Sequence, residues 1–212
     1  MEPRHPWTAP DGILAQEKSF FDDAYDGVPP WDIGRPQPEI VRLEGEGLIQ
    51  REVLDVGCGT GENALFLAQR GHRVLGIDRA TKAITRAKQK ATARGLVAEF
   101  LVWDALKLPG LSRGFDTVID AGLFHVFADE ERGTFVDCLG EVLKLGGRYL
   151  MLCFSDKEPG NWGPRRIKKA EIQRAFGGGW TVDSILPSRF ATHLDDSGAH
   201  SWTVTISRPG KQ

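Results

Sequence analysis

Short apolar runs alternate with amphipathic stretches along most of this chain of 212 residues. Runs rich in β-branched residues, such as Val53–Val56, are typical of buried strands. The stretches between them place apolar residues at helical spacing, as at Ala64, Leu65 and Ala68. This alternation predicts an α/β fold, with a mostly parallel sheet and helices on both faces. Strands are expected at residues 52–57, 73–78, 98–105, 115–122, 148–155, 180–188 and 200–208, and helices at 13–25, 62–71, 80–95, 129–147 and 168–178.

The two ends of the chain differ from this alternating middle. Residues 1–38 are irregular and contain seven prolines, with one predicted helix among them. The last two predicted strands have no long helix between them, which favours an antiparallel pair. In an open sheet of this kind, ligands bind at the carboxyl ends of the strands, where the strand order reverses. We therefore expect the functional residues at that edge.

Composition and charge exclude several classes of function. The formal net charge of −2 gives no electrostatic case for nucleic acid or an anionic membrane. No apolar run approaches the roughly 20 residues that span a bilayer, and the N-terminus lacks the apolar core of a signal peptide. Cys58, Cys138 and Cys153 are too few and too scattered for a disulfide framework or a zinc site, so no metal is expected. The expectation is a cytoplasmic protein, monomeric or homodimeric.

Three glycines lie within five residues after the first predicted strand, in VLDVGCGTGEN. Gly57, Gly59 and Gly61 can adopt positive φ and let a ligand approach the backbone. Their spacing, G-x-G-x-G, differs from the G-x-G-x-x-G that holds a dinucleotide pyrophosphate. Asp55, just before the loop, would repel a pyrophosphate but could serve an ammonium group. Both features disfavour a NAD-dependent dehydrogenase.

Two further aspartates end the next two strands. Asp78 comes 21 residues after Gly57, where a carboxylate can accept hydrogen bonds from ribose hydroxyls. Asp104 is placed to meet the polar edge of a base. Together with the glycine loop, these residues favour a nucleoside with a cationic tail that carries no phosphate.

The motifs VLDVGCGTGEN, VLGID, LVWDALKL, FDTVIDAGLFHVF and VLKLGGRYL resemble the series found in class I S-adenosylmethionine-dependent methyltransferases. The resemblance covers residues 50 to about 207. It implies a seven-stranded Rossmann-like sheet whose last strand is antiparallel. It also implies S-adenosyl-L-methionine as the cofactor and S-adenosyl-L-homocysteine as the product. In this family, Gly57–Gly61 would line the methionine portion, Asp78 would hold the ribose, and Asp104 with Ala105 would meet the adenine.

Two more residues take their expected places from the same resemblance. Arg79 would lie along the adenine face. Cys58 occupies a position in the glycine loop that tolerates small residues, so we interpret it as a packing residue rather than a nucleophile.

A narrower resemblance lies in PPWDIGRPQPEIVRL, residues 29–43, which is similar to a segment of the thiopurine, thiol and halide methyltransferases. In those small-molecule enzymes such a tryptophan packs beside the cofactor, so Trp31 is the candidate for closing the pocket. An aromatic face attracts a sulfonium cation. On this basis, residues 1–38 are expected to form a strap and helix over the pocket. Residues 39–212 would form the S-adenosylmethionine-binding domain.

The need for a catalytic base depends on the acceptor. A thiolate or a halide needs none, whereas a phenol or a protonated ring nitrogen needs one within hydrogen-bond reach. The candidates lie in DAGLFHVFADEE, after the fourth predicted strand. By motif position, Asp120 would orient the cofactor or the acceptor. His125 could take a proton near pH 7, and the alternative is a buried structural histidine.

Aromatic side chains could wall a flat or apolar acceptor, with core packing as the alternative. Residues 155–166 follow the fifth predicted strand and are well placed to act as a lid. Arg165 and Arg166 in this loop could draw in an anionic acceptor or could simply face solvent. The candidate substrate contacts are Phe20, Phe21, Tyr25, Phe124, Phe127, Trp162 and Arg165.

The leading hypothesis is an enzyme that transfers a methyl group from S-adenosylmethionine to a small molecule, namely a thiol, a halide or a similar soft nucleophile. The alternative is O- or N-methylation of a small aromatic, quinol or heterocyclic compound. A third hypothesis is a sensor that binds the cofactor without turnover.

Overall fold

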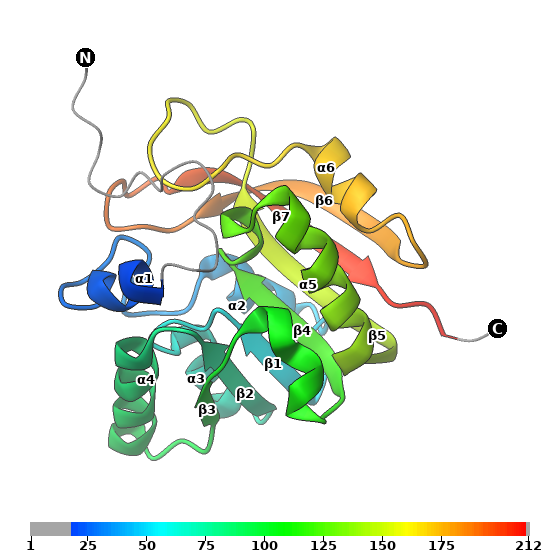
Figure 1. The fold of residues 1–212 in the computed structure, drawn as a ribbon. Helices are drawn as coiled ribbons and strands as arrows, with labels where there is room; N and C mark the ends of the chain where they lie inside the picture. The colour runs from blue at the N-terminus through cyan, green and yellow to red at the C-terminus, as the bar shows by residue number, and fades with distance from the viewer. Residues whose placement is uncertain (1–17, 211–212) are drawn as a thin grey trace.

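The structure is a computed structural model that describes residues 18–210. It contains one seven-stranded sheet with the strand order β3-β2-β1-β4-β5-β7-β6 (Figure 1). β7 runs antiparallel to both of its neighbours, and every other pairing is parallel. The predicted mostly parallel sheet with an antiparallel last strand is therefore confirmed. The strands are β1 (Glu52–Val56), β2 (Arg73–Asp78), β3 (Glu99–Val102), β4 (Phe115–Ala121), β5 (Leu143–Phe154), β6 (Thr181–Phe190) and β7 (Ala199–Ser207).

Helices cover both faces of the sheet. α5 and α6 pack on one face, and α2, α3 and α4 pack on the other. β1 contributes to both cores, since Leu54 packs on the α5 side and Val53 on the α3 side. The helices are α1 (Lys18–Ala24), α2 (Pro38–Gly45), α3 (Glu62–Gln69), α4 (Thr81–Arg94), α5 (Asp129–Val142) and α6 (Lys169–Ala175), with 3-10 helices η1 (Ala105–Leu111) and η2 (Phe124–Val126). Among the described residues, no helix is both long and apolar enough to cross a membrane.

The helix predicted at residues 129–147 is shorter than expected, and this prediction was wrong at its C-terminal end. α5 ends at Val142, and Leu143 already belongs to β5, where it pairs with Phe115. A register irregularity separates this pair from the regular pairing that begins at Thr117. The buried Leu143 extends the helical pattern in the sequence, but its side chain packs in the core as part of a strand.

Two N-terminal helices also differ from the prediction. α2 was not expected in the proline-rich segment, although Pro38 stands at the start of the helix, where its missing N–H is not needed. Ile40 and Leu43 are the buried positions of α2. The helix predicted at residues 13–25 is present from Lys18 to Ala24, and its earlier residues lie outside the described part of the chain.

Residues 29–37, which precede α2 and are from here on called the strap, are hydrogen-bonded to the loop between β6 and β7. The side chain of Gln37 is buried and exchanges two hydrogen bonds with the backbone of Ala191. Its Nε2 donates to the carbonyl oxygen at 3.0 Å, and the Ala191 N–H donates to Oε1 at 2.9 Å. The backbone N–H of His193 donates to the carbonyl oxygen of Pro30 at 2.9 Å. The strap is thereby fixed against the C-terminal strand pair.

Candidate active site

Two adjoining cavities lie at the carboxyl edge of the sheet, around the point between β1 and β4 where the strand order reverses. Their empty volumes are about 1450 Å³ and about 430 Å³, including solvent at the mouths. Five residues line both cavities and join them into one space: Tyr25, Trp31, Gly57, Ala121 and Phe190.

The glycine loop lies where the two cavities meet. Gly57, Gly59 and Gly61 all have positive φ, at 67°, 53° and 84°. Gly57 and Gly59 line the cavities, and a Cβ on Gly59 would lie 2.8 Å from the hydroxyl of Tyr25. Gly61 differs, because a Cβ there would meet the core ring of Phe100 at 2.8 Å. The structure therefore brings two of the three glycines to the site, and the third serves core packing and the start of α3.

Asp55 lies just before the loop in β1, is almost fully buried at 1% exposed, and lines neither cavity. Neither of its carboxylate oxygens has a hydrogen-bond partner of good geometry. Burial raises the pKa of this carboxyl well above its usual range, and Asp120 and Asp78 add to the shift, while the backbone of Ala64 opposes it. An uncompensated buried carboxylate is costly. A cation bound at the loop would reduce that cost.

Asp78 and Asp104 line the larger cavity from the ends of β2 and β3. Asp78 accepts hydrogen bonds from the backbone N–H groups of Gly59, at 2.9 Å, and Ala80, at 2.8 Å. Asp104 accepts from the backbone N–H of Leu106 at 3.0 Å. These bonds orient both carboxylates and leave lone pairs free to accept from a ligand. Arg79 and Ala105 line the same part of the cavity.

The smaller cavity is lined by the strap and the glycine loop, and charged residues surround it. The hydroxyl of Thr60 donates to Asp32 at 2.6 Å. The ammonium of Lys90 donates to Thr60 at 2.7 Å and pairs with Glu62 at 2.8 Å. Arg35 lines the cavity and makes no ion pair with another described residue. Charges of both signs suit a ligand that carries both an ammonium and a carboxylate.

Cys58 also lines the smaller cavity. Burial, with smaller contributions from Asp55 and Asp78, raises the pKa of its thiol well above the usual range. A thiol held in its neutral form is a weak nucleophile, in line with the expected packing role.

Aromatic side chains from α1 and the strap form one wall of the larger cavity. The rings of Phe20 and Phe21 meet edge to face, with 5.3 Å between their centres. The ring of Trp31 lies 6.4 Å from both Phe21 and Tyr25, and its indole N–H donates to the Tyr25 hydroxyl at 3.0 Å. The structure thus brings together four residues that the sequence analysis singled out, and their contacts with ligands stay predictions.

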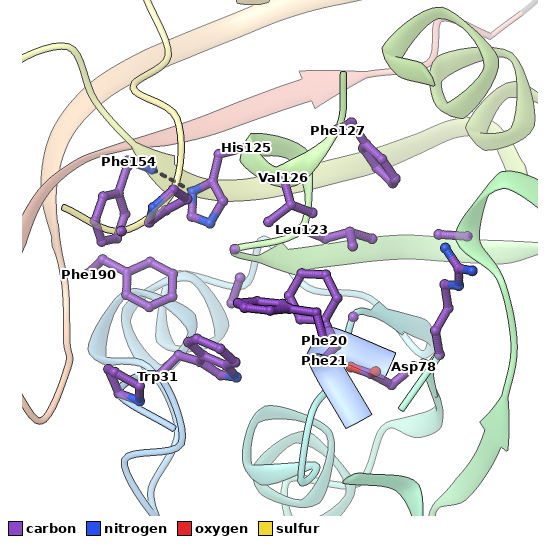
Figure 2. A pocket seen from close by; sticks show the side chains of 18 of the residues that line it. Phe20, Phe21, Trp31, Asp78, Leu123, His125, Val126, Phe127, Phe154 and Phe190 are labelled. Carbon is purple, nitrogen blue, oxygen red and sulfur yellow. Dashed lines mark hydrogen bonds between the residues drawn. The ribbon is translucent and has the colours of Figure 1, made fainter. Parts of the chain in front are cut away.

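The opposite wall comes from the ends of β5 and β6. Phe154 and Phe190 pack with 5.5 Å between ring centres, and His125 lies 5.2 Å from Phe154 (Figure 2). Trp162, in the loop after β5, stacks edge to face on Phe154 at 5.4 Å, and Phe127 also lines the cavity. Phe154 and Phe190 were not predicted, because Phe154 resembles the other apolar residues of its predicted strand and Phe190 lies beyond residue 188, the predicted end of the sixth strand. Their position as the last residue of a strand is the signal that could have found them.

His125 is held in place by its surroundings. The backbone N–H of Phe154 donates to Nδ1 at 3.0 Å, as Figure 2 shows, so the neutral ring carries its proton on Nε2. Burial lowers the pKa of His125 to about 3, and Arg132 and Arg166 also lower it, while the backbone of Gly122 acts the other way. A ring with this pKa is a poor proton acceptor at neutral pH. The geometry favours the structural alternative over the base.

Asp120 and Phe124 are candidate residues that also lie away from the cavities. The carboxylate of Asp120 accepts from the Tyr149 hydroxyl at 2.6 Å and from the N–H groups of Leu123 and Phe124 at 2.7 and 3.0 Å. It therefore fixes the turn after β4 and lines neither cavity. Phe124 is fully buried in the core, beneath the guanidinium of Arg132.

Arg165 also lies away from the cavities. Its guanidinium forms ion pairs with Asp129 and Glu171, and it lines neither cavity. The structure therefore does not bring Arg165 to an acceptor. Within residues 18–210, no group of three or more His, Cys, Asp or Glu side chains could hold a metal ion.

Comparison with known proteins gives one matching family model and several relatives. Residues 53–147 match a model described as a methyltransferase domain. A 2-heptyl-1-hydroxyquinolin-4(1H)-one methyltransferase of Mycobacteroides abscessus is 38% identical over 196 residues, which cover 86% of each chain. A probable thiol methyltransferase of Arabidopsis thaliana is more distant, at 26% identity over 71% of this chain and 67% of the relative.

Two solved structures share the fold. One, from work on the conversion of a disulfide bond into a thioacetal group during echinomycin biosynthesis, has a TM-score of 0.83 and 37% identity. That match covers 92% of this chain and 94% of the other. The second is a 1,6-didemethyltoxoflavin-N1-methyltransferase of Burkholderia thailandensis with bound 1,6-didemethyltoxoflavin and S-adenosylhomocysteine. Its TM-score is 0.75 at 22% identity, over 94% and 93% of the two chains.

Proposed function

Because the chain belongs to the class I S-adenosylmethionine-dependent methyltransferases, we propose that it methylates a small, flat aromatic acceptor such as a hydroxyquinolone or a nitrogen heterocycle. The expected methyltransferase activity and the expected cofactor are confirmed at the level of the family. For the acceptor, the more similar relative supports the aromatic alternative, and the thiol relative is distant.

The residues of the site fit S-adenosylmethionine. The unpartnered carboxylate of Asp55 lies beside a loop whose glycines leave room for a ligand. Asp78 is oriented by two backbone N–H groups and can accept from ribose hydroxyls. The charged smaller cavity suits the methionine end, and Asp104 suits the adenine.

The cofactor supplies a methyl group that is already activated as a sulfonium, so the protein contributes mainly binding and alignment. Trp31 lines both cavities and is placed to separate the cofactor from solvent. Phe21 and Tyr25 pack around its ring and hold it there.

The observation that carries the proposal is the aromatic lining of the larger cavity. We call the space between Phe20, Phe21 and Trp31 on one side and Phe154 and Phe190 on the other the acceptor chamber. Facing aromatic walls favour a flat ring system through stacking and burial. The 2-heptyl-1-hydroxyquinolin-4(1H)-one named for the Mycobacteroides abscessus relative is such a molecule.

Sulfur is the second candidate acceptor. The echinomycin protein, at 37% identity, is connected with chemistry at a disulfide bond. A sulfur nucleophile needs no base, and His125, the candidate base, is a poor proton acceptor at neutral pH.

The test uses methyl-labelled S-adenosylmethionine with three acceptors: 2-heptyl-1-hydroxyquinolin-4(1H)-one, thiophenol and iodide. Label is counted separately in the organic extract and in the headspace. We expect label from the hydroxyquinolone in the extract, and its loss in Asp78→Ala. Label from thiophenol alone would favour the sulfur candidate, and volatile label from iodide alone would favour the halide enzymes. Label from none of the three would contradict the proposal.

A further inference from the structure

We infer that the acceptor chamber selects acceptors that carry a negative charge, because the guanidinium of Arg166 lies behind its wall without an ion-pair partner among the described residues. This inference rests on the proposed function and narrows its substrate class. It points to aromatic compounds with an acidic N-hydroxyl, an acidic phenol or a thiol.

Arg166 is fixed directly behind two residues that line the chamber. Its guanidinium carbon lies 5.8 Å from the ring centre of Phe154 and 5.7 Å from that of Trp162. Its Nη1 donates to the carbonyl oxygens of Trp162 and Pro164 in the loop that follows β5. Trp162 and Pro164 both line the cavity. The charge is thus held in one place by backbone carbonyls, which carry no net charge of their own.

Arg166 forms no ion pair with a carboxylate among the described residues. Its Nε is buried without a hydrogen-bond partner, and burial lowers the pKa of the guanidinium. Glu158 is the acid that acts on it, from beyond ion-pair distance, and its carboxylate accepts from the backbone N–H of His200 at 2.6 Å. Arg165, the adjacent residue, differs in this respect because it pairs with two acids.

Arg132 is a second cation that acts on this wall, although it is paired with two acids. Arg132 of α5 is buried and pairs with Glu171 and Asp129, but its Nε and Nη2 have no partner. Arg132 and Arg166 both lower the pKa of His125, so their positive charges act electrostatically on a residue that lines the cavity. His125 is accordingly neutral at physiological pH.

Three carboxylates and Arg79 also line the larger cavity, and the carboxylates oppose the potential of Arg166, which packs directly against Phe154 and Trp162. Burial raises the pKa of Tyr25 well above its usual range, so its hydroxyl is neutral. Asp78 lies across the cavity from Phe154 (Figure 2), at the end expected to bind the cofactor. Asp104 belongs to that same end, and Glu131 accepts from the backbone N–H of Ala128 at the start of α5.

An anionic acceptor also explains why methyl transfer at this site needs no catalytic base. The acceptor's lone pair forms the new bond to the methyl carbon while the carbon–sulfonium bond breaks and leaves its electron pair on sulfur. One negative and one positive charge are consumed, and no proton has to be removed in the step. The chamber then needs only to stabilise the ionised form of the acceptor, and a fixed guanidinium near the chamber can supply this stabilisation.

The experiment measures the ionisation of a bound probe. 4-Nitrophenol, whose phenolate absorbs at longer wavelength than the phenol, is titrated free and with saturating protein and S-adenosylhomocysteine. We expect the bound probe to have a pKa about one unit lower than the free probe, which is a tenfold preference for the phenolate. Arg166→Gln should remove most of this shift, since glutamine can still donate to the loop carbonyls but is neutral. Arg166→Lys should keep most of it.

Arg165→Gln is the matched control, because it removes one positive charge at the adjacent residue, outside the chamber. It should leave the shift unchanged. An unshifted or raised pKa in the wild type, or a shift that survives Arg166→Gln, would overturn the inference and leave the proposed aromatic acceptor intact. Absence of any binding by phenol or phenolate would overturn both.

Discussion

The hydroxyl of Tyr25 lies 2.8 Å from the position that a Cβ on Gly59 would take. Gly59 also has a φ of 53°, where an L side chain costs about 1–2 kcal/mol. We expect Gly59→Ala to weaken binding of S-adenosylhomocysteine through both the strain and the clash. Tyr25→Phe removes the clashing oxygen, so the double variant should recover part of the affinity. Calorimetry on the four proteins measures this coupling, and strictly additive losses would contradict the contact.

Asp78 is expected to bind the ribose of the cofactor. Asp78→Ala should weaken binding of S-adenosylhomocysteine by roughly 1–3 kcal/mol, since ribose hydroxyls and the N–H of Gly59 lose their acceptor. Asp183→Ala is the control, because Asp183 is an exposed carboxylate on β6, outside the cavities. Equal affinities for wild type and Asp78→Ala in calorimetry would refute the ribose role.

His125→Asn tests whether this residue is a base. With Nδ1 bound to the N–H of Phe154 and a pKa of about 3, we expect the variant to lose the same factor of kcat/KM for phenolic and thiolate acceptors. The loss should come from a misplaced chamber wall. A much larger loss of kcat/KM for the phenol than for the thiolate would instead support His125 as a catalytic base.

The bonds between Gln37 and Ala191 predict that Gln37→Glu loosens the strap. Glutamate cannot donate to the carbonyl oxygen of Ala191, and its charge is buried. We expect the free energy of unfolding to fall by about 1–3 kcal/mol and the KM for the acceptor to rise. Gln50→Glu, at an exposed site before β1, serves as the control in urea denaturation and steady-state kinetics. Equal effects of the two substitutions would argue against the strap contact.

Asp120 gives a pH dependence of stability. Burial raises its pKa from 3.8 to about 6, against hydrogen bonds from Tyr149 and the backbone. Its contribution to stability is therefore complete below pH 3.8 and is lost as the pH rises to about 6. Because Asp120→Asn does not titrate there, the stability difference between wild type and variant should shrink over this range, by at most about 3 kcal/mol. Denaturation midpoints at several pH values measure it, and a difference that grows with pH would contradict the assignment.

Local sequence patterns predicted several strands and the conformation of the glycine loop. β1, β2 and β4 follow the apolar runs closely, and the positive φ of Gly57 and Gly59 follows from their spacing. The end of α5 was missed because Leu143 fits a helical pattern and a buried strand equally well, and only its pairing with Phe115 decides between them.

The acceptor chamber was predicted less well than the cofactor end, because tertiary contacts decide which aromatic residues line it. Phe124 and Phe127 look alike in the sequence, yet η2 turns Phe124 into the core and Phe127 to the cavity. Phe154 and Phe190 lie 36 positions apart and meet only once β7 has paired between their strands. Arg165 and Arg166 likewise differ only in their partners, which no local pattern specifies.

Gln37 and Ala191 are 154 positions apart in the chain, yet their mutual hydrogen bonds hold the strap at the mouth of the site. Contacts between such distant segments require a large loop to close and tend to be made slowly. The glycine loop and the ends of β1 and β2, in contrast, lie within 30 residues of one another. In folding, the cofactor half can therefore assemble early from neighbouring segments, and the chamber is completed only when the strap meets the loop between β6 and β7.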